Sequence, residues 1–201
     1  MTGSEYQYQA TLKLPDWVGP FLACREGCLG SDDERMEFVL TLARENVERR
    51  TGGSFGAAVF ERDSGVLVSV GVNCVIPQQA SLAHAEVMAI LFAQRRLGTF
   101  DLGGEGVPPH ELVTSAQMCA MCYGATLWSG VRRVVCGATR DDVATILGFD
   151  EGPLSGAWVK ELEQREIAVR QGVLRDEAQT VLRRYAELQG VLYHSRQGGE
   201  R

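Results

Sequence analysis

Two cysteines three residues apart, Cys119 and Cys122, stand in the stretch TSAQMCAMCYGATLWSG (residues 114–130). Positions i and i+3 of a helix face the same way, so both thiols can bind one ion from a single turn. This turn follows a predicted strand, and the positive end of a helix dipole favours the thiolate form that metals bind. A lone C-x-x-C pattern is equally compatible with a redox pair or with two buried core thiols.

The histidines decide between these alternatives. His110 follows two prolines in a loop and His194 lies near the C-terminus, and we predict that both are solvated surface groups. His84 instead opens a predicted helix in the segment HAE, with Glu86 two residues on. HAE alone could be a polar helix start. Together with the cysteine pair it gives three ligands and an open fourth position, which is typical of catalytic zinc. Glu86 is then placed to take a proton from the attacking water.

The composition excludes several classes of protein. The chain has 201 residues, 45% of them hydrophobic and 23% charged, which is typical of one globular domain. A net charge of -6 argues against a nucleic-acid partner. No apolar run reaches the roughly 18 residues of a membrane span, and the first ten residues do not resemble a leader peptide. We therefore expect a cytoplasmic protein without a membrane partner, whose close-set cysteines bind metal rather than form crosslinks.

The remaining cysteines carry weaker signals. Cys24 and Cys28 are four residues apart but have no histidine nearby, so we do not predict a second metal site there. Cys74 and Cys136 are predicted to be small buried core residues. Trp128 is expected in the core or in an interface between two copies of the chain, rather than in contact with substrate.

Hydrophobic periodicity and turn residues divide the chain into alternating elements. A capping box, Ser31 with Glu34, begins a helix that ends before Gly52 and Gly53. A hairpin follows, and helices and strands then alternate. The expected strands are 54–61, 66–73, 111–115, 131–139 and 166–173, and the expected later helices are 84–98, 118–130, 140–148 and 175–190. This order predicts a three-layer α/β/α sandwich around a mixed five-stranded sheet, in a single domain spanning 1–201.

H-x-E followed by P-C-x-x-C is a signature of zinc nucleobase deaminases. Here Met118 occupies the proline position. The chain resembles the cytidine deaminase-like superfamily, and most closely the bacterial guanine deaminases, over Ser31 to Arg196. The segments that carry the resemblance are FGAAVFERDSG, GVNCVIP, HAEVMAI, ELVTSAQMCAMCYGATLWSGVRRVVCGATRDDV and GFDEGP. The pair QM before Cys119 replaces the usual EP, a departure that concerns substrate preference more than chemistry.

The resemblance implies an activity and roles for individual residues. It implies hydrolytic deamination of guanine to xanthine and ammonia, with one zinc ion per chain held by His84 and the two cysteines. Glu86 would move protons, and Glu151, the last residue of GFDE, would hold the amine and the adjacent ring N–H. The expected purine-binding residues are Asn73, Phe55 and Ala85. It also implies a homodimer, and a C-terminal tail, 191–201, that covers an active site. Residues 1–30 would form an N-terminal extension.

Three alternatives remain open from the sequence. The chain could deaminate another aminated heterocycle or nucleoside, such as cytosine, cytidine or an amino-triazine. It could be a tRNA adenosine deaminase, although the acidic net charge and the GFDE segment argue against this. It could also be a non-catalytic zinc module, but that reading leaves Glu86 and the open fourth position without a role.

Overall fold

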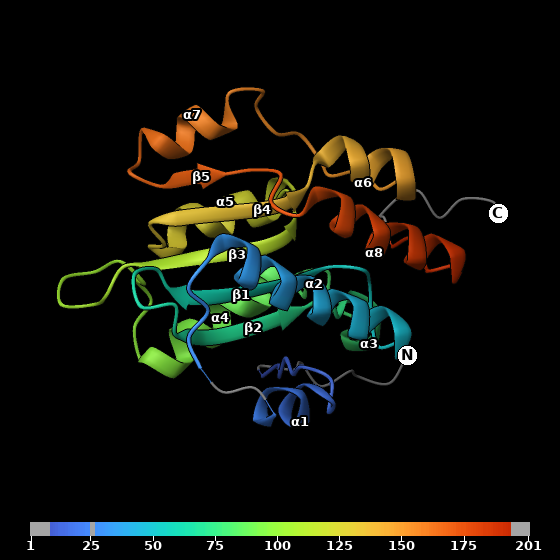
Figure 1. The fold of residues 1–201 in the computed structure, drawn as a ribbon, viewed down its shortest axis with the longest axis horizontal. Coiled ribbons are helices and arrows are strands. Elements are labelled where there is room, and N and C mark those ends of the chain that lie inside the picture. Colours follow the sequence, from blue (N-terminus) through green and yellow to red (C-terminus); the bar gives the residue numbers. More distant parts are fainter. Residues whose placement is uncertain (1–8, 25–26, 194–201) are drawn as a thin grey trace, which may run out of the picture.

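A mixed five-stranded sheet forms the centre of the computed structural model, which describes residues 9–24 and 27–193 (Figure 1). The spatial order of the strands is β2-β1-β3-β4-β5. β1 runs antiparallel to both of its neighbours, β2 and β3, whereas β4 runs parallel to β3 and β5 parallel to β4. Their bounds are β1 Gly56–Glu61, β2 Leu67–Val72, β3 His110–Ala116, β4 Arg133–Ala138 and β5 Ala168–Arg170. The predicted mixed sheet is confirmed.

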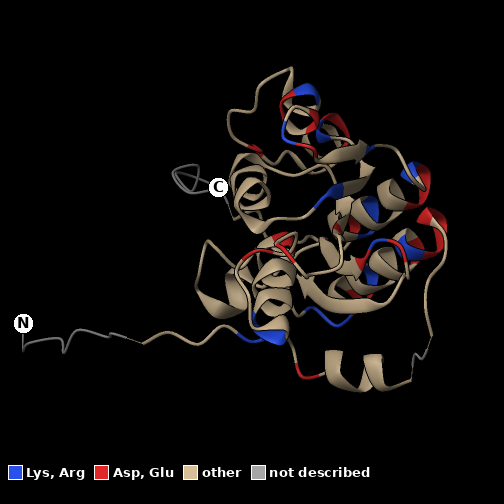
Figure 2. Ribbon diagram, turned by 90° about the vertical axis from the view of Figure 1, so that its left-hand side faces the viewer, with Lys and Arg blue, Asp and Glu red and all other residues tan. Residues whose placement is uncertain are grey.

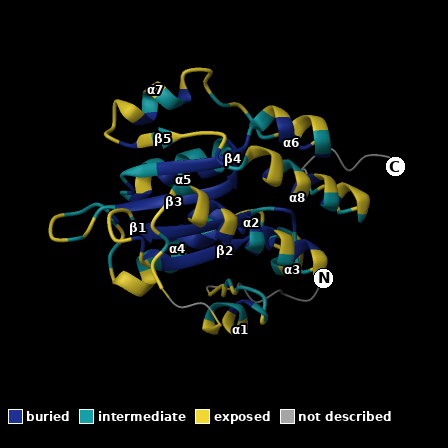
Figure 3. Ribbon diagram, in the orientation of Figure 1, coloured by how far each residue is buried: buried dark blue, intermediate teal, exposed yellow. Residues whose placement is uncertain are grey.

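Helices cover both faces of the sheet (Figure 1). One face packs against α2 (Asp32–Glu48), α6 (Arg140–Leu147) and α8 (Arg175–Glu187). The other packs against α4 (Ala85–Leu97), α5 (Ala120–Ser129) and α7 (Trp158–Glu163). The strands between these helices are largely buried (Figure 3), because apolar side chains on both faces of a central strand are removed from water. The structure thus has the three layers that the sequence predicts.

Local capping signals begin two of these helices as expected. The Ser31 hydroxyl accepts from the Glu34 N–H, and the Glu34 carboxylate accepts from the Ser31 N–H, so the predicted capping box is present. Thr139 and Asp142 form the same reciprocal pair at the start of α6. Each box satisfies backbone N–H groups that a helix start leaves without partners.

Several short elements differ from the prediction. Three helices of four to six residues, α1 (Val18–Ala23), α3 (Val75–Gln78) and α7, were not expected, because such short segments show little periodicity. The fifth strand covers three residues rather than eight. Glu166 before it and Gly172 after it both have positive φ, which ends the extended backbone at each side.

The prediction for His110 is wrong. It is fully buried as the first residue of β3, and its Nδ1 lies 2.7 Å from the Leu102 carbonyl oxygen, because residues 99–109 fold back over it. Trp128 is not in the core, since 85% of it is exposed on α5, and the predicted interface position stays a prediction. Cys74 and Cys136 are buried as predicted. His194 lies outside the described residues.

No helix in the described ranges is both long enough and apolar enough to cross a membrane.

Candidate active site

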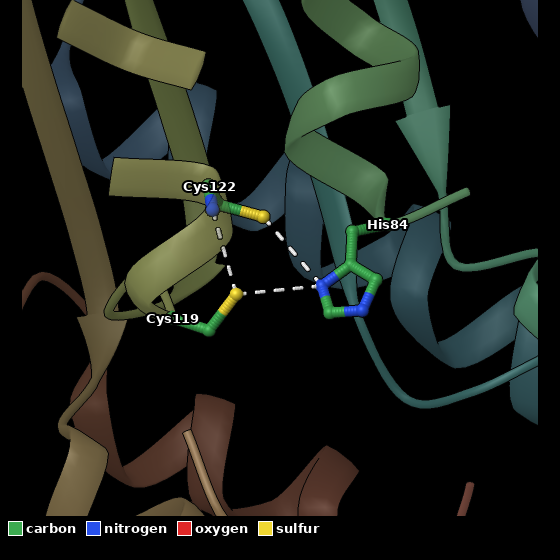
Figure 4. A group of neighbouring side chains, drawn as sticks. All are labelled: His84, Cys119 and Cys122. Atoms are coloured by element: carbon green, nitrogen blue, oxygen red, sulfur yellow. Dashed lines mark hydrogen bonds between the residues drawn. The ribbon is translucent and has the colours of Figure 1, made fainter. Parts of the chain in front are cut away.

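Two helix starts bring the three predicted metal ligands together (Figure 4). His84 is the N-cap of α4 and Cys119 is the N-cap of α5, with Cys122 one turn further along α5. Although His84 is far from the cysteines in sequence, its Nδ1 lies 3.6 Å from the Cys119 Sγ and 3.5 Å from the Cys122 Sγ. The side chains converge because α4 and α5 pack on the same face of the sheet.

The donor set fits a zinc ion. The Nδ1 and the two Sγ atoms all lie within 4.8 Å of one another. Ligand atoms at 2.0–2.3 Å from a tetrahedral ion are roughly 3.3–3.8 Å apart, so the two nitrogen–sulfur separations suit a shared ion. Two sulfurs and one imidazole nitrogen are ligands that zinc prefers, and they leave one coordination position for the cavity beside them.

The charges at this site favour metal binding. A hydrogen bond from Cys122, together with His84, lowers the pKa of the Cys119 thiol to about 4. The same hydrogen bond and burial raise the pKa of Cys122 well above its usual value. Burial alone would lower the pKa of His84, but Cys119 and two nearby carboxylates raise it. Zinc binds thiolates, so a divalent ion at this site would replace the thiol protons of both cysteines.

A cavity of 380 Å³ adjoins the metal ligands. Glu86 faces it from the first turn of α4 and is 6% exposed. Burial raises the pKa of Glu86, and the charge of Cys119 adds to this effect. The cavity is lined by Phe55, Asn73, Ser81, His84, Glu86, Gln117, Cys119, Ala120, Met121, Phe149, Asp150, Glu151, Gly152 and Tyr193. The predicted proton carrier thus shares one cavity with the ligands His84 and Cys119.

Glu151 reaches this cavity from the loop after α6. Its carbonyl oxygen accepts a hydrogen bond from the Ala120 N–H at 2.9 Å, and the Arg140 guanidinium donates to the Gly152 carbonyl oxygen. The first contact holds the end of the GFDE segment against the start of α5, and the second holds the next residue against the start of α6. Burial, followed by the negative charges of Cys119 and Glu86, raises the pKa of Glu151 to about 7. A hydrogen-bond donor on a ligand would favour its charged form.

Two further predicted residues line the cavity. Asn73 follows β2 and is 1% exposed; its Nδ2 has no hydrogen-bond partner among the described residues. A buried amide without a partner costs free energy unless a ligand satisfies it. Phe55 precedes β1, and its ring lies 5.9 Å from that of Phe149. Ala85 is fully buried against the core and is not among the cavity-lining residues of the described chain. The roles of all three stay predictions.

Two aromatic residues of the cavity were not singled out from the sequence. Phe149 is the aromatic residue of GFDE itself. Tyr193 belongs to the C-terminal segment that the resemblance implied would cover an active site, and its ring lies 4.8 Å from that of Phe149 and 6.4 Å from that of His84. The described part of the tail thus reaches the cavity of its own chain. Neither ring carries a spacing pattern that sequence analysis could detect.

A three-layer α/β/α fold with a His–Cys–Cys donor set beside a buried glutamate is typical of zinc-dependent deaminases. A model of the cytidine and deoxycytidylate deaminase zinc-binding region matches residues 30–138. The chain therefore belongs to this family of hydrolases, which act on C–N bonds, and its metal is zinc.

Guanine deaminases are among its relatives. The guanine deaminase of Bacillus subtilis (strain 168) is 34% identical over 137 residues, which cover 68% of this chain and 83% of the relative. A structure of the guanine deaminase from Nitrosomonas europaea superposes with a TM-score of 0.84 at 46% identity, covering 92% of this chain and 100% of that chain. A structure solved in complex with 2,6-diaminopurine is 48% identical with the same TM-score, covering 92% and 96% of the two chains.

Proposed function

We propose that this protein deaminates guanine to xanthine and ammonia. One observation carries the proposal: two carboxylates, the buried one of Glu86 and the half-buried one of Glu151, line the same cavity as His84 and Cys119. One carboxylate can move protons while the other recognises the amine. The similarity to guanine deaminases supports this choice of substrate.

The reaction exchanges the amine of guanine for oxygen. Zinc, when held by His84 and the two cysteines, makes a water molecule acidic enough to act as a nucleophile near neutral pH. The Glu86 carboxylate accepts a proton from water and delivers it to the purine ring nitrogen. A new C–O bond forms at the carbon that bears the amine. Glu86 then carries the remaining proton of the newly added hydroxyl group to the amine, the C–N bond breaks as the C=O bond forms, and ammonia leaves.

Glu151 recognises the substrate edge where the amine lies. Guanine presents an amine and a neighbouring ring N–H, and a carboxylate accepts from both, giving charge-assisted hydrogen bonds. Adenine presents an unprotonated ring nitrogen beside its amine, which repels a carboxylate. In the same cavity, the Asn73 Nδ2 donates to a purine acceptor, and Phe55 packs on the ring.

A small molecule suits the surface better than tRNA. Relatives include the tRNA-specific adenosine deaminase of Buchnera aphidicola subsp. Schizaphis graminum, which is 28% identical over 116 residues. Acidic and basic residues are interspersed along the helices of this chain, as Figure 2 shows, and the net charge is -6. An RNA partner requires a concentrated basic surface to neutralise its phosphates. The six cysteines are free thiols, which supports a reducing compartment, the cytoplasm, for the reaction.

Two copies of the chain associate into a homodimer in this proposal, and residues 1–201 act as one domain. Trp128 on α5 and Leu97 on α4 are 85% and 39% exposed, and large exposed apolar side chains favour protein contacts. Sedimentation of the wild type and of Trp128→Glu measures this association. A wild type that sediments as a monomer at micromolar concentration excludes the dimer.

Ammonia release from a substrate panel tests the activity. The zinc-loaded protein is incubated with guanine, adenine, cytosine, cytidine and guanosine, and Glu86→Gln serves as the control for contaminating activity. We expect guanine to give the highest kcat/KM. Faster release from adenine or cytosine would overturn the proposed substrate, and zinc binding without release from any member of the panel would favour a non-catalytic zinc module.

A further inference from the structure

The segment before the family-matched region is hydrogen-bonded to the end of α2. Trp17, which precedes α1, donates its Nε1–H to the Thr51 Oγ1 at 2.9 Å. Its ring lies edge-on to Phe21 at 5.7 Å, and the Arg49 guanidinium lies 5.6 Å from its centroid. These contacts fix the indole over the turn that follows α2. Residues 9–24 thus contact the part of the chain that leads into β1.

Thr51, which accepts the hydrogen bond from Trp17, in turn contacts the fully buried side chain of Asn46. Thr51 donates its hydroxyl hydrogen to the Asn46 Oδ1 at 2.8 Å. The Asn46 Nδ2 donates to two carbonyl oxygens, that of Gly53 at 2.8 Å and that of Asn73 at 3.0 Å. An amide has one oxygen acceptor and two N–H donors, so this arrangement uses each group once. Rotating the amide by 180° would place its oxygen against two carbonyl oxygens, and Thr51 helps to exclude that state.

The far end of this chain of bonds is a residue of the substrate cavity. Asn73 lines the cavity, and its buried Nδ2 has no partner within the described residues. Its backbone is held on both sides: its N–H donates to the Phe55 carbonyl at 3.0 Å, and its carbonyl accepts from Asn46. A Cβ on Gly52 would lie 1.8 Å from the Asn73 carbonyl oxygen, so the turn also approaches Asn73 too closely for any side chain there.

We propose that Trp17, Thr51 and Asn46 form a positioning relay that holds the Asn73 amide in the substrate cavity. The inference rests on the proposed function, because it takes Asn73 as a purine contact. Asn73 lies just beyond β2, and no backbone N–H of the described residues donates to its carbonyl oxygen, so the sheet does not fix that group. Asn46 replaces that restraint with a hydrogen bond, and Thr51 and Trp17 hold Asn46 in the one orientation that can donate it. The N-terminal segment thereby contributes to substrate affinity without touching the substrate.

A purely structural role predicts something different. In that role, the hydrogen bonds would stabilise the end of α2 and do nothing else, since buried polar groups must be satisfied. Breaking them would then lower the free energy of unfolding and leave the cavity unchanged. A positioning role requires that the effect on substrate disappear when the Asn73 side chain is absent.

Thr51→Val tests the relay, because valine keeps the shape of threonine and removes its hydroxyl. Trp17→Phe is the second variant, since it keeps an aromatic ring and removes the N–H. The matched control is Thr41→Val on α2, whose hydroxyl donates to the Glu37 carbonyl oxygen on the exposed surface. We expect each relay variant to raise the KM for guanine about fivefold with kcat within about twofold, a size typical of coupling within one hydrogen-bond network. The control should change neither.

The same substitutions in an Asn73→Ala background separate positioning from structure. We expect Thr51→Val to change KM less than about 1.5-fold there, since the group that the relay positions is gone. An undiminished fivefold effect in this background would overturn the proposal. So would a wild-type KM in both relay variants.

An NMR measurement reads the Asn73 amide directly. Its side-chain N–H₂ signals are assigned by their loss in Asn73→Ala. In the absence of substrate, we expect Thr51→Val to shift or broaden these signals, and Thr41→Val to leave them in place. Unchanged signals in Thr51→Val overturn the relay. A protein that shows the shift but never releases ammonia from guanine would contradict the proposed function and leave the relay standing.

Discussion

The Nδ1 atom of His84 lies 3.5 Å from the Sγ atom of Cys122, although 38 residues separate them in the sequence. The pair defines a zinc site between the first turns of α4 and α5. Its ligands come from two helices on one face of the sheet, so the metal links those helices to each other. Binding free energy for zinc is therefore also folding free energy for this part of the protein.

Cys122→Ser should abolish zinc binding, because a serine hydroxyl is a poor zinc ligand near neutral pH. Elemental analysis of purified protein is expected to give one zinc per chain for the wild type and much less than one for the variant. Cys24→Ser, at an exposed cysteine, is the matched control and should keep its zinc. Full occupancy in Cys122→Ser would contradict the ligand set.

Glu86→Gln should keep both the fold and the zinc while turnover falls by about 10²–10⁴-fold, the usual contribution of a positioned proton carrier. Glutamine has the shape of glutamate and cannot carry the proton. The measurement is kcat for ammonia release, with zinc content and circular dichroism as controls. Turnover within tenfold of wild type corresponds to only about 1.4 kcal/mol of barrier and would remove Glu86 from this role.

The features that depend on local sequence pattern can be predicted without the structure. The capping box at Ser31 and the helix starts at His84 and Cys119 are each signalled by a few neighbouring residues. Each is present in the structure. The family motif then relates the two helix starts, which periodicity alone could not place side by side. The fold class was predictable for the same reason, since alternating elements leave few packed arrangements.

Other features depend on contacts between distant segments. The burial of His110 follows from how residues 99–109 fold back, and a Gly/Pro-rich loop gives no signal of that path. The bond between Trp17 and Thr51 spans 34 residues. A single hydrogen bond between one indole and one hydroxyl produces no repeating pattern in the sequence, so it could not be predicted.

Glu151→Gln should lower kcat/KM for guanine by on the order of 10² or more, because a polar substrate edge would be left mispaired in a buried cavity. The glutamine N–H₂ group would face the substrate amine, two donors against each other. Zinc content should be unchanged. Glu163→Gln, at an exposed position on α7, is the control and should retain full activity. Undiminished guanine turnover in Glu151→Gln would show that another group recognises the amine.

The ion pair between Asp142 and Arg175 should make stability depend on acidic pH. Both carboxylate oxygens of Asp142 accept from the guanidinium at 2.8 Å, and this contact holds the pKa of Asp142 well below its usual value. Because the pKa of Asp142 is lower in the folded state, its charge stabilises the protein above the unfolded pKa of about 3.9, and this stabilisation is lost as the pH falls toward the folded pKa.

Asp142→Asn should therefore cost about 1 kcal/mol at pH 7, a modest figure because solvent screens the half-exposed Arg175. Urea unfolding should show this gap between variant and wild type closing below about pH 4. Asp141→Asn, at an exposed neighbouring position, should have the same free energy of unfolding as the wild type both at pH 7 and below about pH 4. A gap that stays constant down to pH 2 would show that the Asp142 charge contributes nothing.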